Sequence, residues 1–224
     1  MDQLRFRELL AGVDSVSLRI RLRPLDGPVR TLYRRILTHF AGQGGAPTAQ
    51  TLQTWAAELE VGVDEALAEL VRVDLIQADP ATQRVTSAYP FSDQPRGHRV
   101  EVEGGPTVQA CCAADALGVA AMLHRPVTIS SRDPQSGTEI RVEVRDGRPA
   151  WEPSEALVTI PVDEACAGGQ AGDCQCPAVN FCASAASAEA YQRAHGLALE
   201  MLTVPQAHEL GSAVFGGLLD PEPG

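Results

Sequence analysis

The chain passes from an expected strand to an expected helix at Ala110-Cys111-Cys112-Ala113-Ala114-Asp115-Ala116-Leu117. Thr107–Ala110 has the character of a strand, and the apolar run that follows predicts a short helix over Asp115–Leu123. If this helix begins near Cys112, the spacing of three residues places its thiol beside the carboxylate of Asp115 on one helix face. A thiol next to a carboxylate in an apolar segment is suited to binding a soft metal and transferring one proton.

A second group of cysteines lies further along the chain, in Asp173-Cys174-Gln175-Cys176 and Asn180-Phe181-Cys182-Ala183-Ser184. The Cys-Cys and Cys-x-Cys spacings differ from the C-x₂-C pairs that are typical of structural zinc sites. Apolar alternation around Cys182 predicts a core thiol, and Cys166, in a Gly/Ala-rich stretch, is expected to have no role.

Composition limits the partners and the compartment. The chain has 224 residues, a formal net charge of -11 and six cysteines, all in its second half. An acidic surface repels phosphate backbones, so no nucleic-acid partner is expected. The N-terminus carries charges and no apolar leader, and the longest strongly apolar stretch, Ala116–Leu123, is too short to span a bilayer. These features predict a cytoplasmic protein, independent of the membrane, with reduced cysteines and no structural disulfide.

The first part of the chain divides at Gly27-Pro28. Residues 1–27 are predicted to be an amphipathic lead-in, and residues 28–90 a small domain. Helical periods run over Val29–Phe40, Thr48–Leu59 and Val63–Val73, and a short hairpin then joins Leu75–Ala78 to Arg84–Ser87. Three helices followed by a hairpin predict a winged-helix-like domain.

The third of these helices argues against DNA recognition. It carries Asp64, Glu65 and Glu69 against a single cation, Arg72. A helix that enters the major groove is normally basic. The winged-helix-like domain is therefore predicted to be a structural scaffold that packs on the second domain.

Residues 91–219 are predicted to form a mixed α/β domain with a small antiparallel sheet, followed by a tail at 220–224. The overall class is thus α+β. The expected elements are strands at His98–Glu103, Thr107–Ala110, Val127–Ser131, Glu139–Val144, Leu157–Pro161 and Leu197–Val204, and helices at Asp115–Leu123, Ala188–His195 and Pro205–Leu218. The Gly/Ala-rich stretch Glu164–Gly172 is expected to be a flexible approach to the second group of cysteines.

The ordered combination of these features resembles the alkylmercury (organomercurial) lyase family. A strand leads into Cys112-Ala113-Ala114-Asp115-Ala116-Leu117, a strand pair follows from Val127 to Gly137, and Cys176 precedes Phe181-Cys182-Ala183-Ser184 by five residues. The chain departs from the family pattern in two places. Cys111 stands where the family usually has an aromatic residue, and residues 177–180 replace a more aromatic, histidine-bearing stretch.

The resemblance implies an enzyme that cleaves the carbon–mercury bond of organomercurials by protonolysis, giving a hydrocarbon and Hg(II) held by two cysteines. By resemblance, the catalytic residues that also contact mercury are Cys112, Asp115 and Cys176. Cys174 competes with Cys176 for the second cysteine position, because the preceding loop is longer than in the family. Cys111 and Cys174 are additional candidate ligands. Mercury(II) is a soft cation that prefers thiolate sulfur, which agrees with this set of ligands.

The resemblance further implies that no organic cofactor is needed, because mercury is itself part of the substrate. The expected partner is an organomercurial small molecule, with hand-off of Hg(II) to a thiol-bearing reductase or to small thiols. Two alternatives stay open at this point. The chain could be a diverged family member that binds a soft metal or acts on another small molecule, or it could be a thiol-rich metal-responsive regulator. The carboxylate beside Cys112 favours the lyase, since chelation alone gives an acid no role.

Overall fold

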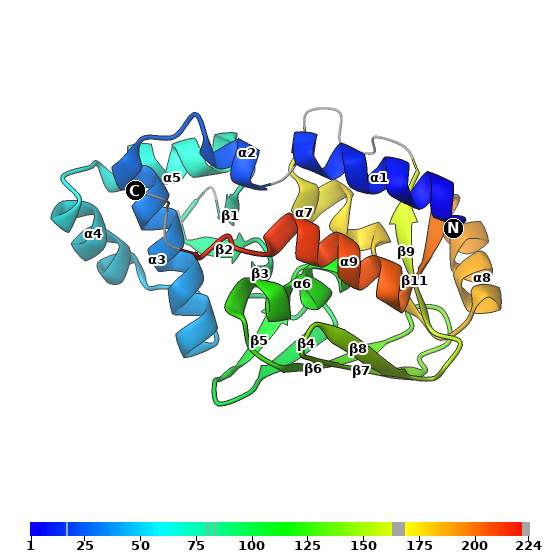
Figure 1. Cartoon of the computed structure of the whole chain (residues 1–224). Helices are drawn as coiled ribbons and strands as arrows, with labels where there is room; N and C mark the ends of the chain where they lie inside the picture. Colours follow the sequence, from blue (N-terminus) through cyan, green and yellow to red (C-terminus); the bar gives the residue numbers. More distant parts are fainter. Residues whose placement is uncertain (17, 80, 83, 163–168, 221–224) are drawn as a thin grey trace.

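The computed structural model describes residues 1–16, 18–79, 81–82, 84–162 and 169–220. These residues form helices α1–α9, a 3-10 helix η1 and strands β1–β11, and the strands lie in two antiparallel sheets (Figure 1). The predicted combination of helices with antiparallel sheet is confirmed. None of the described helices has both the length and the apolar character that a bilayer crossing requires.

The N-terminal helices are α1 Gln3–Val16, α2 Leu18–Leu22, α3 Gly27–Gln43, α4 Ala49–Glu58 and α5 Val63–Arg72. The last three lie where helical periodicity predicts them. Pro28 stands in the first turn of α3, and Gly44 ends that helix with a left-handed φ of 85°. Thr48 caps α4 by accepting a hydrogen bond from the amide of Thr51 at 3.2 Å. The predicted lead-in at 1–27 is thus two helices joined to the start of α3.

The expected hairpin forms from β1 Ile76–Ala78 and β2 Val85–Ala88, which pair antiparallel. It does not stand alone, because β2 pairs with β3 Phe91–Ser92 and β3 pairs with β5. The hairpin is therefore the edge of a large sheet with the order β1-β2-β3-β5-β4-β6-β7-β8. The winged-helix description stays a prediction, and the domain boundary predicted near residue 90 is crossed by this sheet.

The remaining strands of the large sheet are β4 His98–Val102, β5 Thr107–Ala110, β6 Val127–Arg132, β7 Glu139–Arg145 and β8 Arg148–Glu152. The prediction of a small sheet is wrong, because the sheet has eight strands. The sequence analysis missed β8, although Asp146-Gly147 lies between β7 and β8 as a two-residue turn with φ of 50° and 69°. An Asp-Gly pair is a strong hairpin signal, since both residues tolerate positive φ.

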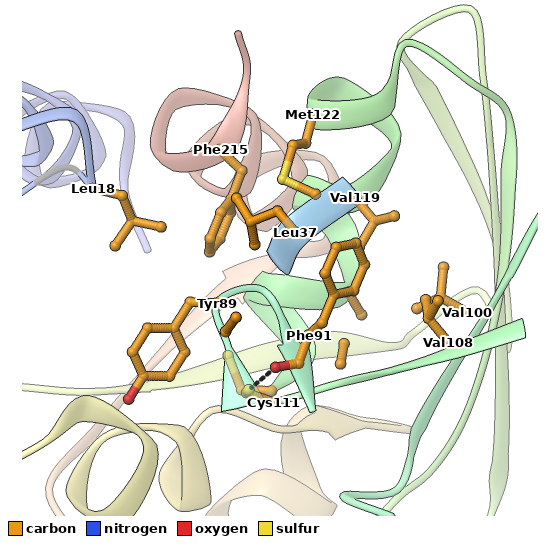
Figure 2. Close-up of a cluster of buried hydrophobic side chains, with 14 of the residues drawn as sticks. Leu18, Leu37, Tyr89, Phe91, Val100, Val108, Cys111, Val119, Met122 and Phe215 are labelled. Carbon is orange, nitrogen blue, oxygen red and sulfur yellow. Dashed lines mark hydrogen bonds between the residues drawn. The ribbon is translucent and has the colours of Figure 1, made fainter. Parts of the chain in front are cut away.

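A second sheet has the order β10-β9-β11, formed by β10 Phe181–Cys182, β9 Leu157–Pro161 and β11 Leu199–Thr203. The later helices are α6 Ala113–Leu123, α7 Ala171–Cys174, η1 Cys176–Ala178, α8 Ala185–His195 and α9 Val204–Phe215. Helix α9 packs along α6, and α1 packs against α9 (Figure 1). Side chains from both sheets and from α1–α6 and α9 join one continuous hydrophobic core, part of which is shown in Figure 2.

Two glycines set the close contact between α6 and α9. A Cβ atom added to Gly211 would lie 2.6 Å from the carbonyl oxygen of Ala114, and one added to Gly118 would lie 2.8 Å from the carbonyl oxygen of Gly211. The backbones of α6 and α9 are therefore in direct contact at Gly118 and at Ala114, the residue that precedes Asp115. Neither element can accept a side chain at this crossing unless the helices move apart.

We expect Gly211→Ala to lower the free energy of unfolding by about 1–3 kcal/mol, because overpacking of a close contact forces a backbone shift. Urea denaturation measures this change. Gly42→Ala is the matched control, since Gly42 also lies inside a helix but a Cβ there meets nothing within 4 Å. The control should be neutral or slightly stabilising. Equal effects from the two substitutions would contradict the proposed tight crossing.

Candidate active site

Cys112 lies at the junction between β5 and α6 and is the N-cap of that helix. Its backbone is extended, with φ of -154° and ψ of 179°, and its carbonyl oxygen accepts the first helical hydrogen bond, from Ala116 at 2.9 Å. The amide of Asp115 donates to the Cys112 sulfur at 3.4 Å. Cysteine thus takes the position that serine or aspartate usually occupies at a helix start. The N-terminal end of the helix dipole favours negative charge on this sulfur.

Cys176 begins the short helix η1, in the connection between α7 and β10. Pro177 stands in its first turn, and the amide of Val179 closes the turn on the Cys176 carbonyl at 3.1 Å. The amide of Ala113 in turn donates to the carbonyl of Val179 at 3.1 Å. This backbone bond joins the segment that carries Cys176 to the residue that follows Cys112, and so brings the two cysteines together.

The two sulfurs and one carboxylate oxygen form a compact cluster. One ligand atom from each of Cys112, Asp115 and Cys176 lies within 4.8 Å of the others, and all three residues are buried. The Cys176 sulfur is 3.8 Å from Oδ2 of Asp115. The structure therefore brings together the three residues that the sequence analysis selected, and these are the residues that could hold a soft metal ion.

Burial controls the acidity of Asp115. It raises the pKa of this carboxyl from 3.8 to about 7, while contacts with the thiols of Cys112 and Cys176 lower it in part. Asp115 is only 7% exposed. A carboxyl with a pKa near neutrality can both accept and release a proton under physiological conditions, which an ordinary aspartate does poorly.

The two thiols of the cluster are held in their protonated form. Burial raises the pKa of Cys112 well above its usual value, and the neighbouring Cys176 and Asp115 add to this effect. For Cys176, the hydrogen bond with Cys112 lowers the pKa, but burial and the charge of Asp115 raise it overall. Without a metal, the site therefore keeps its thiols neutral. A bound soft cation would reverse this, because coordination deprotonates a thiol.

The other described cysteines lie outside this cluster. Cys111 is buried among apolar side chains, and its thiol donates to the carbonyl of Phe91 at 3.2 Å (Figure 2). Cys182 is fully buried, so the prediction of a core thiol is confirmed. Cys174 is disulfide-bonded. The expectation that all six cysteines are reduced is therefore wrong at Cys174, because pairing depends on geometry in the folded chain and not on sequence spacing. Cys166 lies outside the described residues.

A largely apolar cavity of about 620 Å³ opens onto the cluster. Its walls come from elements far apart in the sequence, including Leu9 of α1, Leu18 of α2 and Phe215 of α9. The sequence analysis did not assign α1 or α9 to the site. The apolar periodicity of both segments indicates burial, but only the fold shows that they bury their apolar faces over the cysteines.

Chemically, this arrangement supplies two soft ligands, one proton carrier and an adjacent, largely apolar cavity. Two thiolates are well suited to a soft metal ion, and the carboxyl can move a proton between a sulfur and a third atom bound to that metal. The cavity beside them has room for an organic group attached to the metal.

Comparisons with known proteins show which proteins this chain is similar to. Residues 91–216 match the family model described as alkylmercury lyase (MerB). A curated relative, the alkylmercury lyase of Streptomyces lividans, is 28% identical over 218 residues, which cover 89% of this chain and 99% of the relative. A solved structure described as the mercury-bound form of MerB2 superposes with a TM-score of 0.72 at 21% identity, covering 96% of this chain and 98% of that one. That structure shares the fold.

Proposed function

The chain belongs to the alkylmercury lyase family and is a lyase that processes organomercurials, and we propose that it cleaves the carbon–mercury bond by protonolysis at Cys112, Asp115 and Cys176. The observation that carries this proposal is the buried cluster of two thiols and a carboxyl within 4.8 Å of one another. A site that only binds a metal has no use for a proton carrier beside its two sulfurs.

The first step is the capture of the substrate. One thiol of the pair replaces the ligand X of R–Hg–X, and its proton leaves with X as HX. Mercury is then bonded to one sulfur and to the carbon of R. Soft thiolate sulfur displaces chloride, oxygen or nitrogen ligands readily, so this exchange needs no further activation.

The second and third steps move one proton. The remaining thiol transfers its proton to the carboxylate of Asp115, and its sulfur bonds to mercury, which becomes three-coordinate. Protonated Asp115 then delivers this proton to carbon. The electron pair of the carbon–mercury bond becomes the new carbon–hydrogen bond, R–H departs, and Hg(II) stays bonded to both sulfurs without a change in oxidation state.

The pKa values support this order of events. The transfer from an ordinary thiol near pKa 8.5 to an ordinary carboxylate near 3.9 costs about 6 kcal/mol. Burial raises the pKa of Asp115 to about 7, but it also raises the pKa of both thiols, so the transfer stays unfavourable in the empty site. Coordination of mercury is what lowers the pKa of the thiol. Proton transfer therefore becomes favourable only after the substrate has bound, which protects the thiols from ionising in the empty site.

We propose that the organic group R occupies the apolar cavity and that free thiols remove the product. Leu9, Leu18 and Phe215 present apolar surface beside the cluster, whereas water in this space would compete for mercury and for the proton. An excess of small thiols, or a thiol-bearing reductase, then exchanges with Cys112 and Cys176 and withdraws Hg(II).

The direct test is to incubate the purified protein with phenylmercury and excess thiol and to measure benzene release by gas chromatography. We expect many molecules of benzene per protein molecule, because thiol exchange regenerates the site. The control is a reaction with thiol but without protein. A result with tight mercury binding and no benzene above this control would show that the chain is a metal-binding protein and would contradict the proposed protonolysis.

A further inference from the structure

The segment just before Cys176, residues 170–172, is hydrogen-bonded to the N-terminal part of the chain. Residues Gln170–Gly172, just ahead of Cys176, make side-chain or backbone hydrogen bonds to groups between residues 71 and 89. The amide nitrogen of the Gln170 side chain donates to the carbonyl of Ile76 at 3.0 Å. The N-terminal part of the chain therefore holds the start of α7.

Asp74 is the centre of this attachment. It follows the end of α5 with a left-handed φ of 55°, and its two carboxylate oxygens accept hydrogen bonds from the amide of Ala171 at 3.3 and 3.2 Å. Arg21 donates to Oδ2 of Asp74 at 2.6 Å and holds the carboxylate in place. A carboxylate facing the first amide of a helix is a favourable cap for it, and here the cap comes from another part of the fold.

Tyr89 provides a second, parallel link. Its hydroxyl donates to Oδ1 of Asp74 at 3.1 Å and accepts from the amide of Gly172 at 2.8 Å. Figure 2 shows this hydroxyl directed away from the buried apolar side chains. Burial and the charge of Asp74 raise the pKa of Tyr89, so the hydroxyl keeps the proton that it donates. The backbone amides of the consecutive residues Ala171 and Gly172 therefore donate hydrogen bonds to Asp74 and Tyr89, respectively.

Gly172 has no room for a side chain beside the Gln77 amide. A Cβ atom there would lie 2.3 Å from Oε1 of Gln77, which is itself buried and accepts a hydrogen bond from Ser87 at 2.7 Å. Gly172 therefore lies in contact with the Gln77 side chain and is hydrogen-bonded to Tyr89. At its other end it is fixed by the bond from Ala113 to Val179, so Cys176 lies between two anchors.

We propose that Asp74 and Tyr89 are positioning residues that hold Cys176 within reach of Cys112 and Asp115. Two sulfurs must meet one mercury atom, so the position of the second sulfur sets the rate of the step that makes mercury three-coordinate. A misplacement of about 1 Å at a reacting group can cost about 10²-fold in rate. The role in catalysis rests on the proposed protonolysis, whereas the role in placing the Cys176 sulfur does not.

Asp74→Asn and Tyr89→Phe test this role. Asn keeps the size of Asp74 but loses its charge, and Phe keeps the ring of Tyr89 but removes the group that accepts from Gly172. We expect each to lower kcat for benzene release by about 10–100-fold with a smaller change in KM, because the first thiol still captures the substrate. The ultraviolet absorption of the Hg(II)–thiolate complex should also weaken or shift, since fewer molecules place both sulfurs on one mercury.

Asp93→Asn is the matched control. The side chain of Asp93 is 21% exposed, against 19% for Asp74, and it pairs with Arg84 at 2.8 Å and accepts from the amide of Ala46 at 3.1 Å, away from the Cys176 segment. It should lower the melting temperature about as much as Asp74→Asn and leave kcat and the mercury spectrum unchanged. Loss of kcat in proportion to melting temperature across all three variants would overturn the proposal, as would wild-type kcat and spectrum in Asp74→Asn and Tyr89→Phe.

The spectrum separates failure of this proposal from failure of the proposed function. If the wild-type protein binds Hg(II) through two thiolates but releases no benzene, the protonolysis is wrong, and the spectra of the variants still decide whether Asp74 and Tyr89 place Cys176. If the wild-type protein releases benzene and the two variants have wild-type spectra and rates, the protonolysis stands and only the positioning role is wrong.

Discussion

Cys112→Ser and Cys176→Ser are each expected to abolish release of hydrocarbon from phenylmercury. A hydroxyl is a hard ligand with a far higher pKa than a thiol, so neither variant can form the two-sulfur mercury complex that weakens the carbon–mercury bond. Groups that act as one unit typically lose about as much activity from one deletion as from several, so we expect a loss of about 10³-fold or more for each variant. Benzene release under single-turnover conditions measures it.

Cys182→Ala is the control for this pair. Its thiol is fully buried and outside the cluster, and burial raises its pKa to about 12, so it stays protonated. Removal should cost some stability and leave the rate per folded molecule unchanged. Cys174→Ser reports on the assignment of the second cysteine. If that variant is inactive while Cys176→Ser keeps near wild-type turnover, the second ligand is Cys174, contrary to the geometry of the cluster.

The sequence predicted that Cys112 and Asp115 lie close together, because this part of the geometry is local. Cys112 and Asp115 are three residues apart at a helix start, and helix geometry alone makes them neighbours. Cys176 is different. Its place depends on η1, on the bond between Ala113 and Val179 and on the attachment of α7, none of which has a local signal in the sequence. Only the family resemblance predicted that it belongs with the other two residues.

The same distinction explains the errors in the fold. The long helices α3, α5 and α9 have a clear apolar face and were predicted within a few residues. The two-residue strands β3 and β10 were missed, because a strand of that length is defined by its partners and not by its own periodicity. Missing β3 also hid the link that makes the β1-β2 hairpin part of the large sheet, which is why the predicted sheet was too small.

Asp115→Asn is expected to separate catalysis from mercury binding. Asparagine keeps the size of the side chain but can neither accept nor release the proton, so cleavage should fall by about 10²–10⁴-fold, as is usual when a general acid–base is lost. Hg(II) should still bind, because the sulfurs of Cys112 and Cys176 remain. Benzene release and Hg(II) affinity are measured on the same preparation. Wild-type release rates would remove Asp115 from the mechanism.

Stability gives an independent test of why Asp115 has its unusual acidity. Its pKa is raised by burial from 3.8 to about 7, so the folded state favours the protonated form. The contribution of Asp115 to the free energy of unfolding is therefore largest below about pH 4, falls as the pH rises towards 7, and is constant above that, with a total loss of up to about 4 kcal/mol. Asparagine carries no charge to bury and should not show this fall.

We therefore expect Asp115→Asn to have a higher melting temperature than the wild type at pH 8 and a similar one at pH 4. If Asp115 instead acted as an ordinary first-turn carboxylate that stabilises α6 through the helix dipole, the substitution would lower stability at pH 8 by about 0.3–1 kcal/mol and leave cleavage intact. The two roles predict opposite signs for the change in melting temperature at pH 8. A variant that melts higher at pH 8 while cleaving more slowly would show that the fold keeps a buried carboxyl at a cost in stability, because the proton transfer requires it.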